Sequence, residues 1–202
     1  MPTAMTADTV GAEKIEALPQ TTFQIIPVKG LPFVAVWLVG LVVAIAANKL
    51  WALDFFHVVG GAGWTVIDLF LGFILGPIMG RLSLSSRIDF VTKLMPKMIL
   101  LVPTLVISTL VAGLQLARRE HYLLSSYSYH GWVVASIIVV GVMTIIAIGL
   151  LEPANLAVLF ELKKPKPNGE IVAKLMRRFI YTAAITGAMQ VATLVIMTRL
   201  AT

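Results

Sequence analysis

The chain has 202 residues, of which 58% are hydrophobic and only 13% are charged, and its mean hydropathy is +0.93. Soluble proteins carry about 25% charged residues, so this composition excludes an ordinary soluble domain and indicates a multi-pass membrane protein in a lipid bilayer. The absence of cysteine excludes disulfides, thiolate metal sites and iron–sulfur clusters. The net charge of +6 falls in short loops beside apolar runs, as in membrane proteins generally, so we expect no nucleic-acid partner.

Residues 1–30 are polar and form the predicted N-terminal tail, with a short interfacial helix around residues 10–18 as the alternative. They lack a basic segment followed directly by a short apolar stretch and a small-residue cleavage site, so we expect no signal peptide. The first span follows at residues 31–51, where Pro32 is tolerated in the opening turn. Only a few residues separate it from the next apolar run, which predicts two antiparallel neighbours.

The second span, residues 54–80, is the helix around which we expect the others to pack. At about 100° per residue, His57, Trp64 and Asp68 fall in one sector of this helix. Ionisable residues are costly in hydrocarbon, so they usually face the interior of a bundle. Small residues continue from the same sector and predict a helix-packing face: Gly72, Gly76 and Gly80.

The remaining spans are predicted at residues 88–119, 130–152 and 171–200. Ser86 followed by Asp89 resembles a capping box, so we expect the third span to start there, and its two prolines should kink it. The segment after residue 152 is basic and rich in turn-forming residues, so we expect a loop. The predicted fold class is therefore all-α, a polytopic transmembrane bundle of five spans.

Lysine and arginine orient these spans. They cluster after the second span and again between the fourth and fifth, and such loops lie on the cytoplasmic side. This places the N-terminus in the cytoplasm and the C-terminus outside the cell (inner) membrane. The exception is an arginine pair after the third span: Arg118 and Arg119.

The same topology brings all three histidines to the outer side of the membrane. His57 lies near the outer end of the second span, His121 follows the third and His130 begins the fourth. Neutral imidazole is the commonest metal ligand, so these residues, with Asp54 nearby, are candidate metal or haem ligands. Asp68 lies roughly 16 Å deeper along its helix, near the middle of the membrane.

Each candidate has a structural alternative. His57 can instead form a hydrogen bond across a helix interface, and Trp64 can fill volume rather than stack on a ligand. Asp68 is either a proton, ion or ligand residue or one member of a structural pair. Its candidate partners are a hydroxyl on another span or one of three longer side chains: Gln115, Gln190 and Arg177.

His57, Trp64 and the sequence FLGFILGPIMGR resemble the first core helix of a group of small bacterial membrane proteins. The group includes copper-resistance D-type proteins, the membrane protoporphyrinogen oxidase family and predicted integral membrane proteins. The resemblance implies a four-helix core with one added N-terminal span, and His57 as a haem or metal ligand beside Trp64. The oxidase family has a second histidine near the far end of this helix, where residues 77–80 have none, so the resemblance carries no enzymatic assignment.

Three functions follow from these observations. The first is binding of haem b or copper near the outer face, for electron transfer or metal handling, with His57 as the principal ligand and His130 or His121 as the second. The second is a non-catalytic accessory or assembly role, with other membrane subunits or a second copy as the partner. The third is a small-solute or metal permease, in which Asp68 is the coupling residue.

Overall fold

A computed structural model describes residues 23–201 of the chain. All its regular elements are helical, and five helical segments are long and apolar enough to cross a membrane: Val28–Ala47, Leu50–Arg81, Leu84–Arg119, His130–Leu162 and Gly169–Leu200. The predicted all-α bundle with five spans is confirmed. Most of the predicted N-terminal tail, including the alternative interfacial helix, lies outside the described residues.

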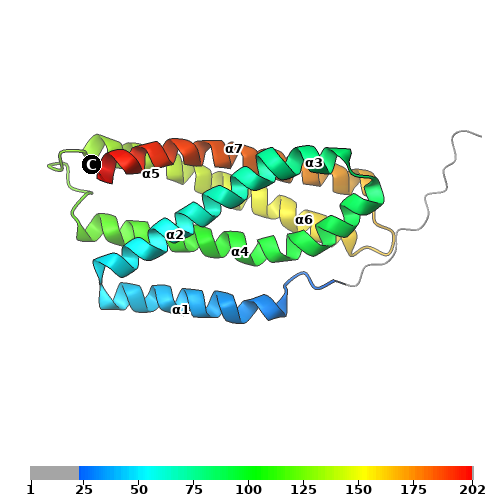
Figure 1. The fold of residues 1–202 in the computed structure, drawn as a ribbon, viewed down its shortest axis with the longest axis horizontal. Helices are drawn as coiled ribbons and strands as arrows, with labels where there is room; N and C mark the ends of the chain where they lie inside the picture. The colour runs from blue at the N-terminus through cyan, green and yellow to red at the C-terminus, as the bar shows by residue number, and fades with distance from the viewer. Residues whose placement is uncertain (1–22, 202) are drawn as a thin grey trace, which may run out of the picture.

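The spans run side by side along one long axis, and the combined α2–η2–α3 span crosses the bundle obliquely (Figure 1). The first span has a short η1 turn before α1, and the second and fourth spans each contain a π-helical segment. In chain order the elements are η1 (Val28–Gly30), α1 (Leu31–Ala47), α2 (Leu50–Leu69), η2 (Phe70–Leu75), α3 (Gly76–Arg81), α4 (Leu84–Arg119), α5 (His130–Ile146), η3 (Ala147–Leu151), α6 (Glu152–Leu162) and α7 (Gly169–Ala201).

The two π-helical segments occur where proline interrupts a span. η2 is followed at the second position by Pro77, and η3 in the same way by Pro153. Proline has no N–H to donate and its ring crowds the preceding turn, so a wider π turn accommodates it within a continuous span. α4 also contains two prolines, Pro96 and Pro103, yet it remains one α-helix from end to end.

Three predicted boundaries are wrong. The first span ends at Ala47 and the second begins at Leu50, earlier than expected, because Asn48 in the left-handed conformation ends α1. α4 begins at Leu84, before the expected start, because Ser83 caps it by accepting a hydrogen bond from the Ser86 N–H at 3.3 Å. Ser86 is therefore not the cap, and Asp89 pairs with Lys93 instead. The fourth span does not end at residue 152, because the helix continues through the π turn to Leu162.

The loop between α6 and α7 is consequently short. The Glu161 carboxylate holds its two sides together by accepting hydrogen bonds from the Asn168 N–H at 3.1 Å and from Lys164 Nζ at 2.5 Å. The Asn168 side chain in turn accepts from the backbone N–H groups of Glu170 and Ile171, which begin α7. This arrangement fixes the start of α7 beside the end of α6.

α1 lies at the edge of the bundle, as expected of an added span. Only Leu41 and Ala44 of this helix are buried, and its main contacts are with α4 and α2. The Trp37 indole donates a hydrogen bond to the Ser108 hydroxyl of α4 at 2.6 Å, and its ring packs edge-on against Phe56. The other four spans therefore form the core of the bundle.

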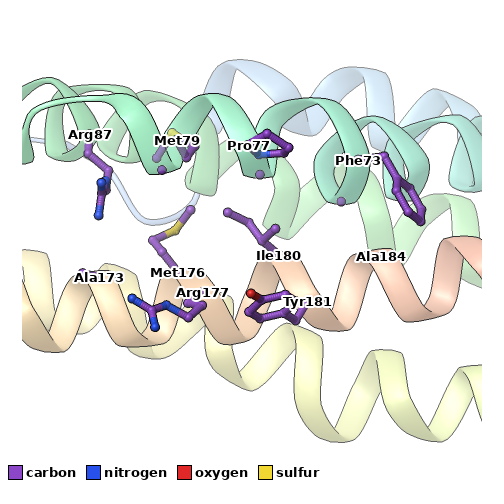
Figure 2. Close-up of a pocket in the computed structure, with 13 residues that line it drawn as sticks. Phe73, Pro77, Met79, Arg87, Ala173, Met176, Arg177, Ile180, Tyr181 and Ala184 are labelled. Atoms are coloured by element: carbon purple, nitrogen blue, oxygen red, sulfur yellow. The ribbon is translucent and has the colours of Figure 1, made fainter.

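The glycine row of the second span meets α7 over only part of its length. A Cβ on Gly72 would lie 2.5 Å from the Ala184 Cα, and one on Gly76 would lie 2.7 Å from a methyl of Ile180, so the two helices touch here. A Cβ on Gly80 would meet nothing within 4 Å. The predicted packing face is confirmed for the first two glycines, and beyond them α3 and α7 leave a groove (Figure 2).

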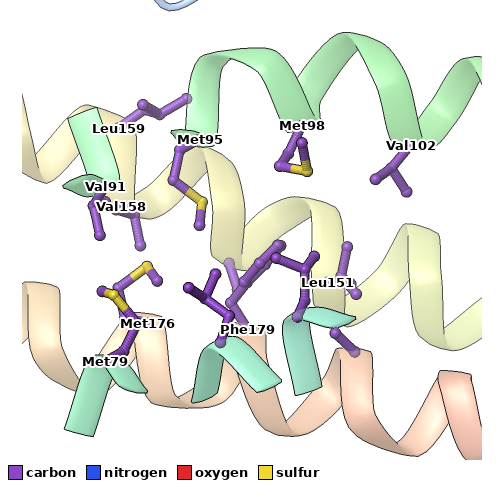
Figure 3. Packing of buried hydrophobic residues seen from close by; sticks show 14 of the residues in the cluster. Met79, Val91, Met95, Met98, Val102, Leu151, Val158, Leu159, Met176 and Phe179 are labelled. Carbon is purple, nitrogen blue, oxygen red and sulfur yellow. The ribbon is translucent and has the colours of Figure 1, made fainter. Parts of the chain in front are cut away.

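The main hydrophobic core lies between α4, α6, α7 and the second half of the second span (Figure 3). Phe179 is fully buried there, and Met79, Met95 and Met176 fill the space around it. Large apolar side chains on the outside of the bundle remain exposed, such as Val36 and Ile145. This distribution suits a bundle surrounded by lipid, where side chains facing outward are also apolar.

Candidate functional site

A carboxylate inside the bundle forms the centre of the candidate site. Asp68, in the last turn of α2, has no exposed surface. Its Oδ2 accepts a hydrogen bond from the Thr186 hydroxyl at 2.7 Å and another from Gln190 Nε2 at 3.1 Å. Thr186 and Gln190 are four residues apart on α7 and so share one face of that helix. Gln190 and a hydroxyl were both among the partners that the sequence suggested.

Several polar atoms around Asp68 have no hydrogen-bond partner among the described residues. They include the second oxygen of Asp68, Oε1 of Gln190 and Nε1 of Trp64, which lies one turn before Asp68 and is only 3% exposed. Buried polar atoms are almost always paired, with protein or with another bound species. The Trp64 indole is near enough to interact with the Asp68 carboxyl, so the unmatched donors and acceptors gather around this one group.

A second carboxylate lies at the junction of η3 and α6. Glu152 begins α6, and Oε1 of its side chain is buried without a hydrogen-bond partner. Asn155, one turn later, is fully buried, and neither polar atom of its side chain has a hydrogen-bond partner. Asp68 is one of the charged groups near enough to influence Glu152, after burial and the neighbouring Asn155.

Glu152 and Asn155 were not predicted as site residues. The sequence Glu152–Pro153 resembles the start of a loop, and only the continuous helix to Leu162 places both residues inside a span. The available signal was the apolar run that follows Pro153, which is long enough to extend the helix. If Pro153 is taken as part of a longer span, Glu152 becomes a second acid within the membrane.

Neither acid forms a salt bridge with a cation of the described residues. Within residues 23–201 the salt bridges lie near the ends of the spans: Lys93 with Asp89, Arg119 with Glu120, and Lys164 with Glu161. Arg177, a candidate partner of Asp68, lines the groove beside α3 instead. The unpaired acceptors are carboxylate and amide oxygens, which suit a proton or a hard cation rather than a soft transition metal.

The structure turns His57 toward α4. Its Nδ1 lies 2.9 Å from the Thr109 carbonyl oxygen, and a Cβ on Gly113 would lie 2.6 Å from two atoms of the imidazole ring. Because a carbonyl only accepts, Nδ1 carries the proton, and in the neutral tautomer Nε2 has the lone pair. A hydrogen bond of this kind also orients histidines that bind metals through the other nitrogen.

The other two histidines belong to the segment that joins α4 to α5, at the same end of the bundle as the start of α2 (Figure 1). His121 is exposed, with a φ of 58°, and His130 is the first residue of α5, with Nδ1 buried and unpartnered. Asp54 is exposed on α2. In the part of the chain that the structure describes, no three His, Asp or Glu side chains gather as a metal-binding group.

Tyrosines dominate this connecting segment. The rings of Tyr122 and Tyr127 lie 4.8 Å apart between centroids, and Tyr129 packs edge-on against Tyr127. Burial raises the pKa of the Tyr122 phenol above its ordinary value of 10.0, and the neighbouring Tyr127, Glu120 and Asp54 add to the effect. The phenol is therefore held in its neutral form.

No family model, curated protein or solved structure matches the chain. The fold and the site together define a class: an all-α protein with five helical segments, among residues 23–201, that can cross a membrane, and with two acidic side chains inside the bundle.

Proposed function

We propose that this protein carries a proton or a small cation across the membrane by binding it at Asp68 and Glu152, and that this ion movement, which also proceeds without the solute, drives the uptake of a small solute. This is a permease function. The observation that carries it is a fully buried carboxylate, Asp68, held by two donors from α7 but with its other oxygen unpartnered. An acid at this depth is costly unless something neutralises it, and such residues mark proton and ion pathways.

The backbone beside both acids supports this function. η2 begins two residues after Asp68, and η3 ends immediately before Glu152. π turns replace the regular hydrogen-bond ladder and are frequent at functional sites. Both π segments also contact α7, the helix that supplies the two donors to Asp68. A shift of register in either segment would move an acid relative to α7 and change its access to water.

The distribution of basic residues supports one orientation of the bundle in the membrane. Lysine and arginine are abundant at the end of the bundle that contains the α3–α4 and α6–α7 connections. The positive-inside rule assigns this end to the cytoplasm, with the N-terminus inside and the C-terminus outside, in the cell (inner) membrane. Asp68, in the middle of its span, would then be reached from either side through the bundle.

Ion movement in vesicles tests this function. The full chain is reconstituted in liposomes, and a valinomycin-imposed membrane potential drives either protons, read by a trapped pH dye, or ²²Na⁺. We expect wild-type vesicles to accumulate one of these ions faster than empty liposomes, and Asp68→Asn and Glu152→Gln to abolish the difference. Asp89→Asn is the matched control, because Asp89 is an exposed acid paired with Lys93.

Two results would overturn the proposal. One is wild-type protein that moves neither protons nor Na⁺ above the background of empty liposomes. The other is undiminished ion movement in Asp68→Asn, because an amide cannot exchange a proton or carry the charge that balances a cation. Loss of movement in Asp89→Asn as well would show a general defect in folding or insertion and would also count against the site.

A second candidate function, binding of haem b or copper for electron transfer or metal handling, has one specific observation in its favour. The hydrogen bond from His57 Nδ1 to Thr109 leaves Nε2 free to act as a ligand. This role is the one that the resemblance to copper-resistance D-type proteins implies. The space beside His57 is occupied by α4, however, and the cavities on α3–α7 and around Trp132 include no histidine.

An absorption spectrum and elemental analysis of detergent-purified protein test this candidate. Haem binding predicts a Soret band, and copper binding predicts about one equivalent of metal, in each case lost in His57→Ala. His121→Ala serves as the matched control, since His121 is exposed in the connecting segment. A colourless, metal-free protein after growth with added haem precursor and copper would rule the candidate out.

A further inference from the structure

The groove between α3 and α7 is a separate feature from the acidic site. It has a volume of about 620 Å³, which lies within the range of small-molecule sites. It is closed where Gly72 and Gly76 touch α7 and open beside Gly80, where a side chain would meet nothing. Two arginines stand at the open end, Arg87 from α4 and Arg177 from α7, while apolar side chains line the rest (Figure 2).

Neither guanidinium has an acidic partner among the described residues. Arg87 is half-buried and donates one hydrogen bond, from Nη2 to the Leu82 carbonyl at 3.2 Å, while its Nε is buried without a partner. Arg177 is exposed and lines the same groove from the opposite wall. Two unpaired guanidinium groups around one space favour an anion, and planar forks of N–H donors match phosphate.

The rest of the groove is lined mainly by apolar side chains. Phe73 and Tyr181 are 59% and 64% exposed, so the groove opens sideways to the lipid rather than only to water. Pro77 and Ile180 continue its lining toward the closed end. A ligand that fills this space must therefore carry a negative head at the basic end of the bundle and a hydrocarbon chain along the helices.

We propose that the groove binds one anionic phospholipid, with its phosphate between Arg87 and Arg177 and an acyl chain along α3 and α7. Basic pockets between transmembrane helices at the cytoplasmic end are known to hold such headgroups. The lipid phosphate supplies the negatively charged partner that the two arginines lack. Its acyl chain covers the exposed apolar side chains of the groove. This inference does not depend on the proposed function of Asp68 and Glu152.

Lipid retention by the full chain in detergent is the test. Purified protein is titrated with phosphatidylglycerol or with phosphatidylcholine of the same acyl chains, and bound lipid is counted by native mass spectrometry. We expect one phosphatidylglycerol to bind, at least about tenfold more tightly than phosphatidylcholine, because phosphatidylglycerol has a net negative charge, whereas the choline of phosphatidylcholine offsets the charge of its phosphate.

Paired variants separate the groove from general surface charge. Arg87→Gln with Arg177→Gln should lower the apparent affinity for phosphatidylglycerol at least about tenfold. Lys174→Gln with Arg178→Gln is the matched control, since it removes the same charge from exposed residues of α7 that do not line the groove. The control should stay within about twofold of wild type, because its charges act only through screened solvent.

A steric variant keeps the test decisive if the arginine variant does not fold. Gly80→Trp places a large side chain in the open mouth of the groove, where nothing obstructs it, and leaves both arginines in place. It should also displace the lipid. The inference fails if phosphatidylcholine binds as tightly as phosphatidylglycerol, or if both pairs of variants weaken binding equally. It also fails if inorganic phosphate alone displaces the lipid, or if a dimer that retains no lipid buries the groove.

Discussion

Replacement of Thr186 by valine tests how firmly α7 holds Asp68. The two side chains have nearly the same shape, so the change removes the hydroxyl that donates to Asp68 at 2.7 Å and little else. The same hydroxyl also lies 3.1 Å from the carbonyls of Thr182 and Ala183, both longer contacts within its own helix. The principal loss is therefore the bond to the carboxylate.

The expected cost is about 1–1.7 kcal/mol of unfolding free energy. Hydrogen bonds between transmembrane helices average about 0.6 kcal/mol and reach about 1.7 kcal/mol. The upper part of this range applies because the acceptor is a fully buried acid whose other oxygen already lacks a partner. Gln190 still donates to Oδ2 at 3.1 Å, so the carboxylate is not left entirely without donors.

Equilibrium unfolding in mixed detergent micelles, followed by circular dichroism, measures this cost. Thr182→Val is the matched control, because Thr182 is also buried on α7 but its hydroxyl donates only to the Arg178 carbonyl of its own helix. The control should change stability by less than about 0.5 kcal/mol. A double-mutant cycle with Asp68→Asn isolates the pairwise energy.

Equal stability of Thr186→Val and wild type would refute the reasoning, as would a coupling energy near zero between positions 186 and 68. Either result would mean that the carboxylate does not depend on α7 for its position. The proposed transport site would then depend less on α7, because the remaining interactions of Asp68 are with Gln190 and with the Trp64 indole of its own helix.

Three further predictions concern packing and pH. Gly72→Leu should cost about 1–3 kcal/mol in the same unfolding assay, because its Cβ would lie 2.5 Å from the Ala184 Cα, whereas Gly80→Leu, with open space, should be nearly neutral. Trp37→Phe removes the indole donor to a serine of α4 and should cost about 1 kcal/mol; unchanged stability would show that α1 is held by apolar contacts alone. The raised pKa of Tyr122 means that its ionisation is harder in the folded state, so stability should fall as the pH rises above about 10, and Tyr122→Phe should lessen that fall.

The sequence is sufficient to predict the five spans because each is an apolar run of membrane-spanning length, a signal that depends on composition alone. It is also sufficient for a packing face at Gly72 and Gly76, since small residues at intervals of four face one neighbour, but the sequence does not say that this neighbour is α7. The residues at which a helix begins or ends are harder to predict, because they depend on small differences in local backbone energy. Pro153 resembles a stop, and only the π turn before it, which widens the backbone, allows the helix to continue.

The candidate site was predictable to the extent that one acid stood alone in a long apolar run. Asp68 satisfied that condition, and the structure buries it. Glu152 did not, because it stands beside Pro153 at the predicted end of the fourth span, where an acid is ordinary. The choice of Thr186 and Gln190 as partners depends on how α7 is rotated against α2, and this rotation is set by the close contact of the two helices at Gly72 and Gly76 rather than by local sequence.

α7 connects the two proposed sites physically. Thr186 and Gln190 hold Asp68, and Arg177, about two and a half turns earlier on the same helix, lines the lipid groove. Between them lies Ala184, whose backbone touches Gly72 at the start of the widened η2 turn. A phospholipid in the groove separates α3 from α7 on one side of the contact between Gly72 and Ala184. Asp68 lies on the other side of that contact. Because packed helices shift as rigid units, occupancy of the groove and the hydrogen bonds to Asp68 should respond to each other through that crossing point.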